Sequence, residues 1–166
     1  MVGVLSLLFV AGPPLSKGIG EYVDNHDFQV ADINGKNGVV DDIVANEAEA
    51  FAAARRFLSY LPASVHETAP RAPCADPAAR RDESLLEIVP RDRRVPYKMR
   101  RIVEACVDAG SFFETGRQWG RGLITGFARL NGYSVALIAG DPMFLAGAWT
   151  ADVCRKLIKH VDLAET

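Results

Sequence analysis

The sequence has little of what builds a covalently cross-linked or metal-held scaffold. Its 166 residues include three cysteines and three histidines. Cys74, Cys106 and Cys154 are far apart and odd in number, which argues against a disulfide framework and favours reduced thiols in a cytosolic setting. The histidines are equally scattered, and because no pair of them has metal-ligand spacing, we expect no zinc site.

The sequence also lacks a strong net charge and a long apolar run. A formal charge of −2 argues against a chain built mainly to bind nucleic acid or an anionic membrane. The apolar stretch at the N-terminus is only about ten residues long, follows no basic residue and is too short to cross a bilayer. We expect residues 4–10 to form a buried strand rather than a signal peptide, and no other segment is apolar enough for a membrane helix.

The first motif, "FVAGPPLSKGIGE" at residues 9–21, has the layout of a nucleotide-binding P-loop without its chemistry. The apolar run predicts a strand, Gly12 breaks it, and a helix is expected to follow. A P-loop needs Gly-Lys-Ser/Thr in that order, whereas residues 16–18 read Ser-Lys-Gly. Because Pro13 and Pro14 also lack the backbone N–H groups that a phosphate cradle uses, we expect no ATP site.

Proline divides the chain near its middle. Hydrophobic residues make up 49% of the sequence, enough for a core, but residues 62–81 carry four prolines and little hydrophobic pattern, which predicts a linker between residues 1–61 and 82–166. In the first unit, residues 22–38 are polar and predicted to be irregular. A helix is predicted over 41–61, where two aspartates suit the positive end of the helix dipole. The apolar residues at helical spacing are Ile43, Val44, Ala48, Phe51, Leu58 and Leu61.

The second unit opens with a predicted helix over residues 95–110, "VPYKMRRIVEACVDAG". Pro96 suits its first turn, and Gly110 is a plausible C-terminal stop. Seven arginines surround this start, and they form either a solvated surface or a docking patch for an anionic cofactor: Arg80, Arg81, Arg91, Arg93, Arg94, Arg100 and Arg101.

A hairpin and a last helix complete the second unit. Two apolar runs, 122–130 and 133–140, flank Asn131-Gly132, the strongest short hairpin signal. The second run is apolar on both faces, as expected inside a covered sheet. After a loop, Thr150 is expected to cap a helix whose apolar face is Val153, Leu157, Ile158 and Val161. This order predicts an α/β fold with helices covering a sheet.

Several blocks of the chain together resemble one enzyme family. The blocks are "FLSYLP", "LLEIVPRDRRVPYKMRRIVEACVDAGSFFE", "GFARLNGYSVALIA" and "PMFLAGAWTADVCRKLIKHVD". In order and spacing they resemble the carboxyltransferase (β) subunit of biotin-dependent acyl-CoA carboxylases, which include propionyl-CoA and acetyl-CoA carboxylases, and the related decarboxylases. The resemblance covers roughly residues 4–20 and 38–162.

The resemblance implies a crotonase-like fold, in which each half is a β-β-α superhelix. Residues 1–61 are then the end of the N-terminal half and residues 82–166 the beginning of the C-terminal half. It also implies that a carboxyl group moves from carboxybiotin to the α-carbon of an acyl-CoA. Backbone N–H pairs, rather than a side-chain nucleophile, hold the developing charge in such a site. The glycine-rich segments that supply these donors are expected outside this chain, which alone is expected to be inactive.

The same resemblance implies partners and a compartment. Biotin is expected on a biotin carboxyl carrier or biotin carboxylase subunit, and the active site between the N-half of one copy and the C-half of another implies a homo-oligomer. The cytoplasm or the mitochondrial matrix is the expected location. Two alternatives stay open: a decarboxylase subunit of the same family, and a non-catalytic assembly or regulatory module that kept the scaffold.

Three departures from the family's pattern affect expected contacts. The family commonly has Ala-Asn-Gln-Pro where residues 139–142 read Ala-Gly-Asp-Pro. Its Gly-Gly-Ala…His block is not found in residues 22–37, and Lys98 stands where the family usually has Asp. These changes concern substrate or carrier contacts, so a divergent or truncated member is expected.

Two loops are the candidate substrate- and cofactor-binding sites. The first, near the acyl-CoA side of the N-half, contains Gly12, Pro13 and Lys17, and Lys17 either meets a CoA phosphate or is an exposed structural lysine. The second runs from a strand end toward a helix N-terminus, where crotonase-like folds place backbone donors over thioester groups. Its candidate residues are Gly140, Asp141, Pro142 and Gly147, of which Asp141 either faces a ligand or caps the turn.

Aromatic and acidic residues in and just before the hairpin have two interpretations. Their rings either line a pocket or, as is more usual, pack in the core. Glu114 is either a polar contact near the cleft or part of a surface salt bridge. The aromatic residues are Phe112, Phe113, Trp119 and Phe127.

Overall fold

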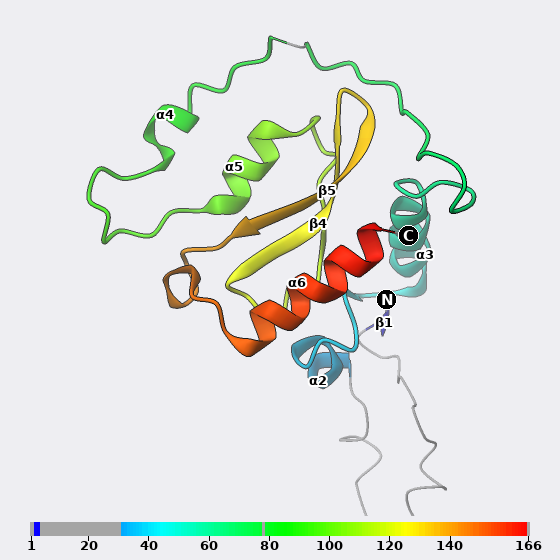
Figure 1. The fold of residues 1–166 in the computed structure, drawn as a ribbon, viewed down its shortest axis with the longest axis horizontal. Helices are drawn as coiled ribbons and strands as arrows, with labels where there is room; N and C mark the ends of the chain where they lie inside the picture. The colour runs from blue at the N-terminus through cyan, green and yellow to red at the C-terminus, as the bar shows by residue number, and fades with distance from the viewer. Residues whose placement is uncertain (1, 4–30, 78, 166) are drawn as a thin grey trace, which may run out of the picture.

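The computed structural model describes residues 2–3, 31–77 and 79–165 (Figure 1). The predicted strand over 4–10 and the glycine loop after it lie outside the described residues. In chain order the elements are β1 (Val2–Gly3), α2 (Ala31–Lys36), β2 (Ile43–Val44), α3 (Glu47–Leu58), α4 (Leu85–Ile88), α5 (Met99–Cys106), β3 (Phe113–Thr115), β4 (Leu123–Leu130), β5 (Tyr133–Gly140), a 3-10 turn (Leu145–Gly147) and α6 (Ala151–Ala164).

The main sheet is antiparallel, in the order β3–β4–β5. The hairpin predicted at Asn131-Gly132 is confirmed, with Leu130 opposite Tyr133. Asn131 and Gly132 have φ values of 50° and 81°. Two consecutive left-handed residues are what the tightest twisted hairpins require, and asparagine and glycine tolerate that conformation best.

Helices cover both faces of this sheet (Figure 1). Phe113 and Glu114 are consecutive in β3, so their side chains point to opposite faces. On the Phe113 face, its register partner Phe127 has its ring centroid 5.3 Å from that of His160 on α6. On the other face, Glu114 accepts hydrogen bonds from Arg100 of α5. The predicted α/β layout is thus confirmed.

The core runs along β4 rather than β5. Every residue from Leu123 to Ala128 is buried, and Ile124 and Ala128 have no exposed surface. The prediction that 133–140 lies inside a covered sheet holds only in part, because no residue of β5 is buried and β5 pairs only with β4 among the described residues. Ile138 of β5 is accordingly 46% exposed.

The first long helix is shorter than predicted. Asn46 caps α3 by accepting from the N–H of Glu49, and the Glu49 carboxylate accepts in return from the N–H of Ala45. Residues 43–44 are not helical, since they form β2, which pairs in parallel with β1. The predicted helix over 41–61 therefore begins six residues later, at Glu47.

Residues 31–36 correct a second prediction, because they form α2 where the sequence was expected to be irregular. Local composition gives no helical signal there, and contacts hold the turn in place instead. A Cβ atom added to Gly35 would lie 2.8 Å from the side chain of Ile43, and the N–H of Val40 donates to the carbonyl of Asn34. Packing against β2 thus decides this short helix.

The two later helices agree with prediction in part. Helix α5 begins after Pro96 and ends before Gly110, so it is shorter than residues 95–110. Thr150 caps α6 as predicted, by accepting from the N–H of Val153. The face that α6 buries, however, consists of Val153, Lys156 and His160. Ile158 and Val161 are exposed, so the predicted apolar face is only partly the packed one.

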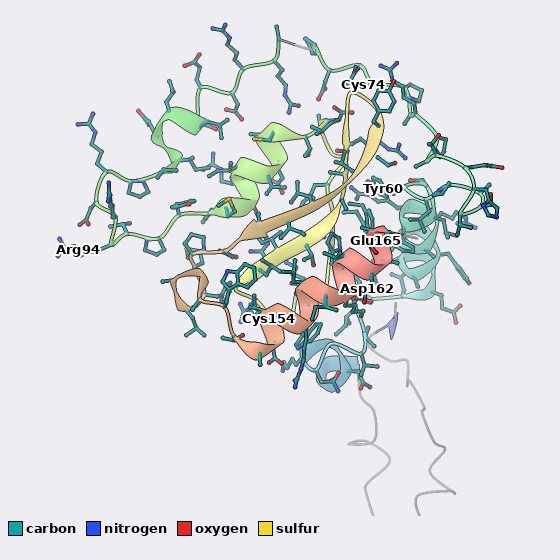
Figure 2. All side chains as sticks on the ribbon, viewed as in Figure 1. Tyr60, Cys74, Arg94, Cys154, Asp162 and Glu165 are labelled. Carbon is teal, nitrogen blue, oxygen red and sulfur yellow. The ribbon has the colours of Figure 1, made fainter. Side chains whose placement is uncertain are left out.

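The described part of the predicted linker, residues 62–77 and 79–81, contains no helix or strand, yet it is tied to the second unit. Arg71 donates to Asn131 at the hairpin turn, and Arg80 donates to the carbonyls of Ala105 and Val107. Whether the chain divides into two lobes here stays a prediction. All three cysteines are free, and Cys74 and Cys154 lie far apart (Figure 2).

Candidate functional site

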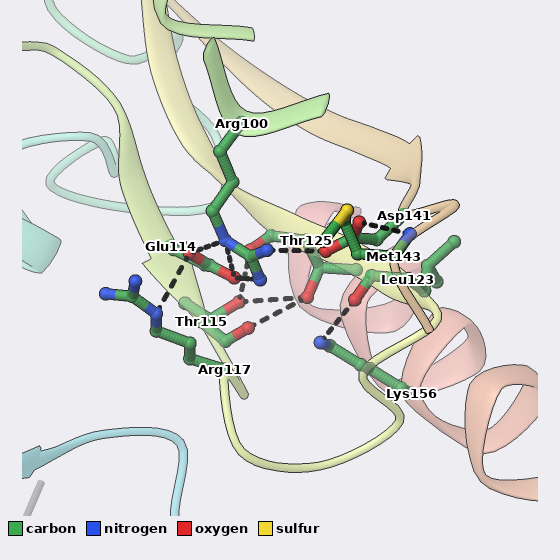
Figure 3. Close-up of polar contacts among 9 residues, drawn as sticks. All are labelled: Arg100, Glu114, Thr115, Arg117, Leu123, Thr125, Asp141, Met143 and Lys156. Atoms are coloured by element: carbon green, nitrogen blue, oxygen red, sulfur yellow. Dashed lines mark hydrogen bonds and ion pairs between the residues drawn. The ribbon is translucent and has the colours of Figure 1, made fainter. Parts of the chain in front are cut away.

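A connected cluster of buried and half-buried polar side chains centres on Arg100 of α5 (Figure 3). Its guanidinium donates to both carboxylate oxygens of Glu114 on β3, at 2.6 and 2.9 Å, and to Asp141 after β5, at 2.5 Å. These contacts, with the Glu114 hydrogen bond as the largest cause, raise the pKa of Arg100 above its ordinary value. One arginine therefore ties a helix, a strand and a loop together.

Asp141 fixes the beginning of the loop after β5. Its side chain is 1% exposed, and beyond the ion pair it accepts from the N–H of Met143 at 3.1 Å. Its own N–H donates to the carbonyl of Gly122 before β4. Of the two roles expected for Asp141, capping the turn is therefore the one that its hydrogen bonds perform.

The loop continues through an unusual backbone. Leu145, Ala146 and Gly147 are all left-handed, with φ values of 48°, 53° and 75°. Such a conformation is costly for residues other than glycine and persists only where the surroundings enforce it. Within the described residues, the N–H groups of Leu145 and Ala146 donate to no acceptor. The loop thus presents free backbone donors next to β5.

A buried lysine lies beneath the same region. Lys156 of α6 is 3% exposed, and its Nζ donates to the carbonyl of Leu123 at 2.6 Å. Burial lowers the pKa of its ammonium group to about 8. One turn further along α6, burial and the charge of Lys156 lower the pKa of His160. Neither ring nitrogen of His160 makes a well-formed hydrogen bond within the described structure.

A groove of about 430 Å³ opens beside the loop, between the start of α5 and the turn before β4. We call it the arginine groove. Its cationic lining consists of Lys98, Arg100, Arg101, Arg117 and Arg121, and its apolar lining of Met143 and Phe144. A second hollow of about 490 Å³ lies between α3 and β3 and shares Arg100, Glu104 and Arg117 with the groove.

The structure separates the residues predicted as binding sites. Asp141, which also lines the groove, and Pro142 lie at the start of the loop after β5, with Gly140 preceding it and Gly147 at its far end. Gly12, Pro13 and Lys17 lie outside the described residues. The aromatic predictions divide: Trp119 and Phe127 are buried in the core, whereas Phe112 and Phe113 are half-buried and line the second hollow.

Sequence reasoning missed the roles of two basic residues. The sequence presents Arg100 only as one of seven clustered arginines, of which Arg91, Arg93 and Arg94 are exposed in the structure. Lys156 carried a weak signal, because it stands three residues after Val153 and four before His160, on the stripe that α6 buries. Of the two roles open for Glu114, it makes a salt bridge, but its side chain is only 10% exposed, so the bridge is not a surface one.

The described part of the chain shows neither a metal-binding cluster nor a membrane-spanning helix. No group of histidine, cysteine, aspartate and glutamate side chains there is arranged to hold a metal ion. No helix among residues 31–77 and 79–165 is long and apolar enough to cross a membrane.

Comparison with known proteins gives one consistent result. The chain is 33% identical to the propionyl-CoA carboxylase beta chain of Roseobacter denitrificans, over 99% of this chain and 33% of that protein. It is 36% identical to the methylmalonyl-CoA decarboxylase subunit alpha of Veillonella parvula, again over 99% of this chain and 33% of the relative. The chain therefore spans about a third of the length of these curated relatives.

Solved structures agree with the sequence comparison. The hexameric transcarboxylase 12S core, solved with hydrolyzed methylmalonyl-coenzyme A bound, superimposes with a TM-score of 0.85 at 27% identity, over 96% of this chain and 32% of that one. The α/β structure is thus part of a crotonase-like fold of the carboxyltransferase class. The chain belongs to the carboxyl transferase domain family, which it matches over residues 1–166.

Proposed function

We propose that this chain is part of an enzyme that transfers a carboxyl group from carboxybiotin to the α-carbon of an acyl-CoA, of the acetyl-CoA or propionyl-CoA carboxylase type. Family membership over the whole chain supports the reaction class. The observation in the structure that favours it most is the loop after β5, whose free N–H groups at Leu145 and Ala146 suit an anionic oxygen.

Each candidate residue of this loop has a role in the proposal. Gly140 and Gly147 have no side chain, so they let a ligand approach the backbone closely. Pro142 follows Asp141 and restricts the turn. Asp141 acts as a positioning residue, because its carboxylate is already bound by Arg100 and by the N–H of Met143. Gly12, Pro13 and Lys17 remain predicted contacts for acyl-CoA.

Biotin enters the proposal as a group carried by a partner subunit. When bound, it supplies the carboxyl group and a basic ureido nitrogen. The residues of this chain fit such a group, because a ureido carbonyl is an acceptor and the loop offers two backbone donors without a partner in the described structure. We further propose that the protein works as a homo-oligomer, by analogy with the hexamer named for transcarboxylase 12S.

The direct test uses the protein purified at its natural length, a carboxylated biotin carrier protein, and propionyl-CoA or acetyl-CoA. Mass spectrometry is expected to detect methylmalonyl-CoA or malonyl-CoA, with equal loss of carboxybiotin. Light scattering checks the oligomeric state. If the protein binds acyl-CoA but carboxylates neither acyl-CoA nor the biotin carrier, the proposal is wrong and the alternative of a non-catalytic module is supported.

The second candidate is a decarboxylase subunit, which the similarity to the Veillonella parvula protein favours. The chemistry is the same in reverse, so the direction of net transfer separates the two. Methylmalonyl-CoA and biotin-loaded carrier are mixed with the protein, and carboxybiotin formation is compared with its consumption. A decarboxylase subunit is expected to carboxylate the carrier several times faster than it carboxylates propionyl-CoA.

A further inference from the structure

Lys156 joins α6 to the turn between β3 and β4, which spans residues 116–122. The Lys156 Nζ donates to the carbonyl of Leu123, the first residue of β4, at 2.6 Å (Figure 3). Two glycines of the turn pack against the stem of the same side chain, because a Cβ atom added to Gly116 or Gly120 would lie 3.2 Å from it. Both glycines are left-handed, with φ values of 62° and 52°. The turn therefore fits closely around this one buried side chain.

The end of the same turn supports the loop after β5. The carbonyl of Gly122 accepts from the N–H of Asp141 at 2.8 Å, and Leu123 lies opposite Gly140 in the β4–β5 register. A Cβ atom added to Gly122 would lie 3.7 Å from the carbonyl oxygen of Phe144 in the loop. Turn and loop thus meet through backbone atoms, so a shift of the turn displaces the loop.

The stability of the fold does not account for a lysine at this position. Lys156 is 3% exposed, and burial disfavours its charge, as its lowered pKa shows. The carboxylates of Glu114 and Asp141, whose charges favour the ammonium group, are paired with Arg100. A methionine would fill the same space without an ammonium group to desolvate. What the lysine adds is its hydrogen bond at the start of β4.

We propose that Lys156 is a positioning residue of the candidate site: its hydrogen bond to Leu123 holds the 116–122 turn, and through Gly122 the loop after β5, in the geometry that presents the free N–H groups of the loop. Lys156 contacts no substrate in this role and acts through the backbone. The inference rests on the proposed function only in that these N–H groups then meet an oxyanion. The order of the loop is measurable without any carboxyl transfer.

Hydrogen–deuterium exchange of the protein at its natural length measures the order of the loop. Mass spectrometry follows the peptide over residues 139–148, in which the N–H groups of Asp141, Gly147 and Ala148 donate hydrogen bonds. Lys156→Met keeps most of the side-chain volume and removes the donor. It is expected to speed the exchange of this peptide about tenfold, the effect of losing one charged hydrogen bond.

A second lysine of α6 provides the matched control. Lys159→Met makes the same change three residues further along the helix, on a side chain that is 42% exposed, and is expected to leave exchange of the loop peptide unchanged. The peptide over residues 123–130 of β4 reports global unfolding and is not expected to exchange faster in either variant. An unchanged loop exchange in Lys156→Met would overturn the proposal.

Gly120→Ala disturbs the same contact from the side of the turn, and it keeps the proposal testable if Lys156→Met does not fold. The added Cβ atom would lie 3.2 Å from the Lys156 side chain and 3.1 Å from the carbonyl of Asp152, so the turn is expected to move away from α6. Gly110→Ala has a left-handed φ of 68° but open space around the added carbon. Gly120→Ala is expected to speed loop exchange more than Gly110→Ala does, and equal rates would contradict the positioning role.

Kinetics separate this role from a structural one and from the proposed function. With propionyl-CoA and carboxylated carrier, Lys156→Met is expected to lower kcat about ten- to a hundredfold, with KM for acyl-CoA within about twofold of the wild type. The variant is expected to unfold at no lower urea concentration than the wild type, which a lysine with only a structural role would not show. Unchanged kcat in an active enzyme would reject the positioning role and leave the proposed function intact. Faster loop exchange without carboxyl transfer by either protein would retain the link from α6 to the loop and reject the proposed function.

Discussion

Replacing the buried Lys156 by methionine tests whether burial destabilises its ammonium group. The folded pKa of about 8, against an ordinary value of 10.5, corresponds to about 3 kcal/mol favouring the neutral amine in the folded state. Below pH 8 Lys156 is protonated in both the folded and the unfolded state, so the full cost of burying its charge lowers the free energy of unfolding. Between pH 8 and 10.5 the unfolded chain binds more protons, so the free energy of unfolding is expected to rise with pH by up to about 3 kcal/mol.

The Lys156→Met variant has no such group, so this rise is expected to disappear from its stability curve. At pH 7 the variant no longer pays the desolvation cost of the buried ammonium group, but it loses the hydrogen bond to the Leu123 carbonyl. Its free energy of unfolding is therefore expected to exceed that of the wild type by about 0–2 kcal/mol. Urea unfolding at pH 7.5, 8.5, 9.5 and 10.5 measures the pH dependence of the free energy of unfolding and the difference between the variant and the wild type. Lys159→Met is the control, since the Lys159 side chain is 42% exposed. Parallel pH curves for the wild type and Lys156→Met would refute the reasoning.

Three further substitutions test the packing around the site by thermal or urea unfolding. Asp141→Asn leaves the Arg100 charge with one partner in a buried site and is expected to cost about 3 kcal/mol. Gly38→Ala is expected to lower the free energy of unfolding by about 2 kcal/mol or more, because a Cβ atom would lie 2.5 Å from the ring of Trp119 at a φ of 85°. Asn46→Ala removes the cap of α3 and is expected to cost about 1 kcal/mol.

Each of these predictions has a matched comparison. Gly110→Ala has a similarly left-handed φ of 68° but open space around the added carbon, so it isolates backbone strain from the clash at Gly38. Asp92→Asn removes an exposed ion pair and is expected to change stability by less than about 1 kcal/mol. Equal losses for Asp92→Asn and Asp141→Asn would show that burial of the Arg100 pair adds nothing. A larger loss in Asn46→Asp than in Asn46→Ala would contradict the capping role.

Short sequence motifs predicted the turns and caps whose geometry depends only on neighbouring residues. The Asn131-Gly132 turn and the Thr150 cap were both identified correctly, because each depends on a few neighbouring residues. The start of α3 was missed, although Asn46 and Glu49 carry a capping signal, because Ile43 and Val44 extended the helical pattern. Both residues are β-branched and favour strands, and they pair with β1, which lies some forty residues away in sequence, so their helical spacing was misleading.

The candidate site was predictable only in outline. The glycine and proline residues after β5 indicated a strand-end loop, and resemblance of whole blocks indicated the carboxyltransferase family. Neither indicated that Arg100 reaches Asp141, 41 positions further along the chain. Such a contact depends on which faces of α5 and β5 meet, and side-chain periodicity gives no information about that.

The sequence by itself determined the α/β class, the hairpin, the free cysteines and membership of the carboxyl transferase domain family. Tertiary structure alone decided that β4 is the buried strand, that Lys156 is removed from water, and that Asp141 is bound by an arginine. The physical reason is the range of the interactions. Turns and caps are fixed within a few residues, whereas burial and charge pairing depend on segments that only folding brings together.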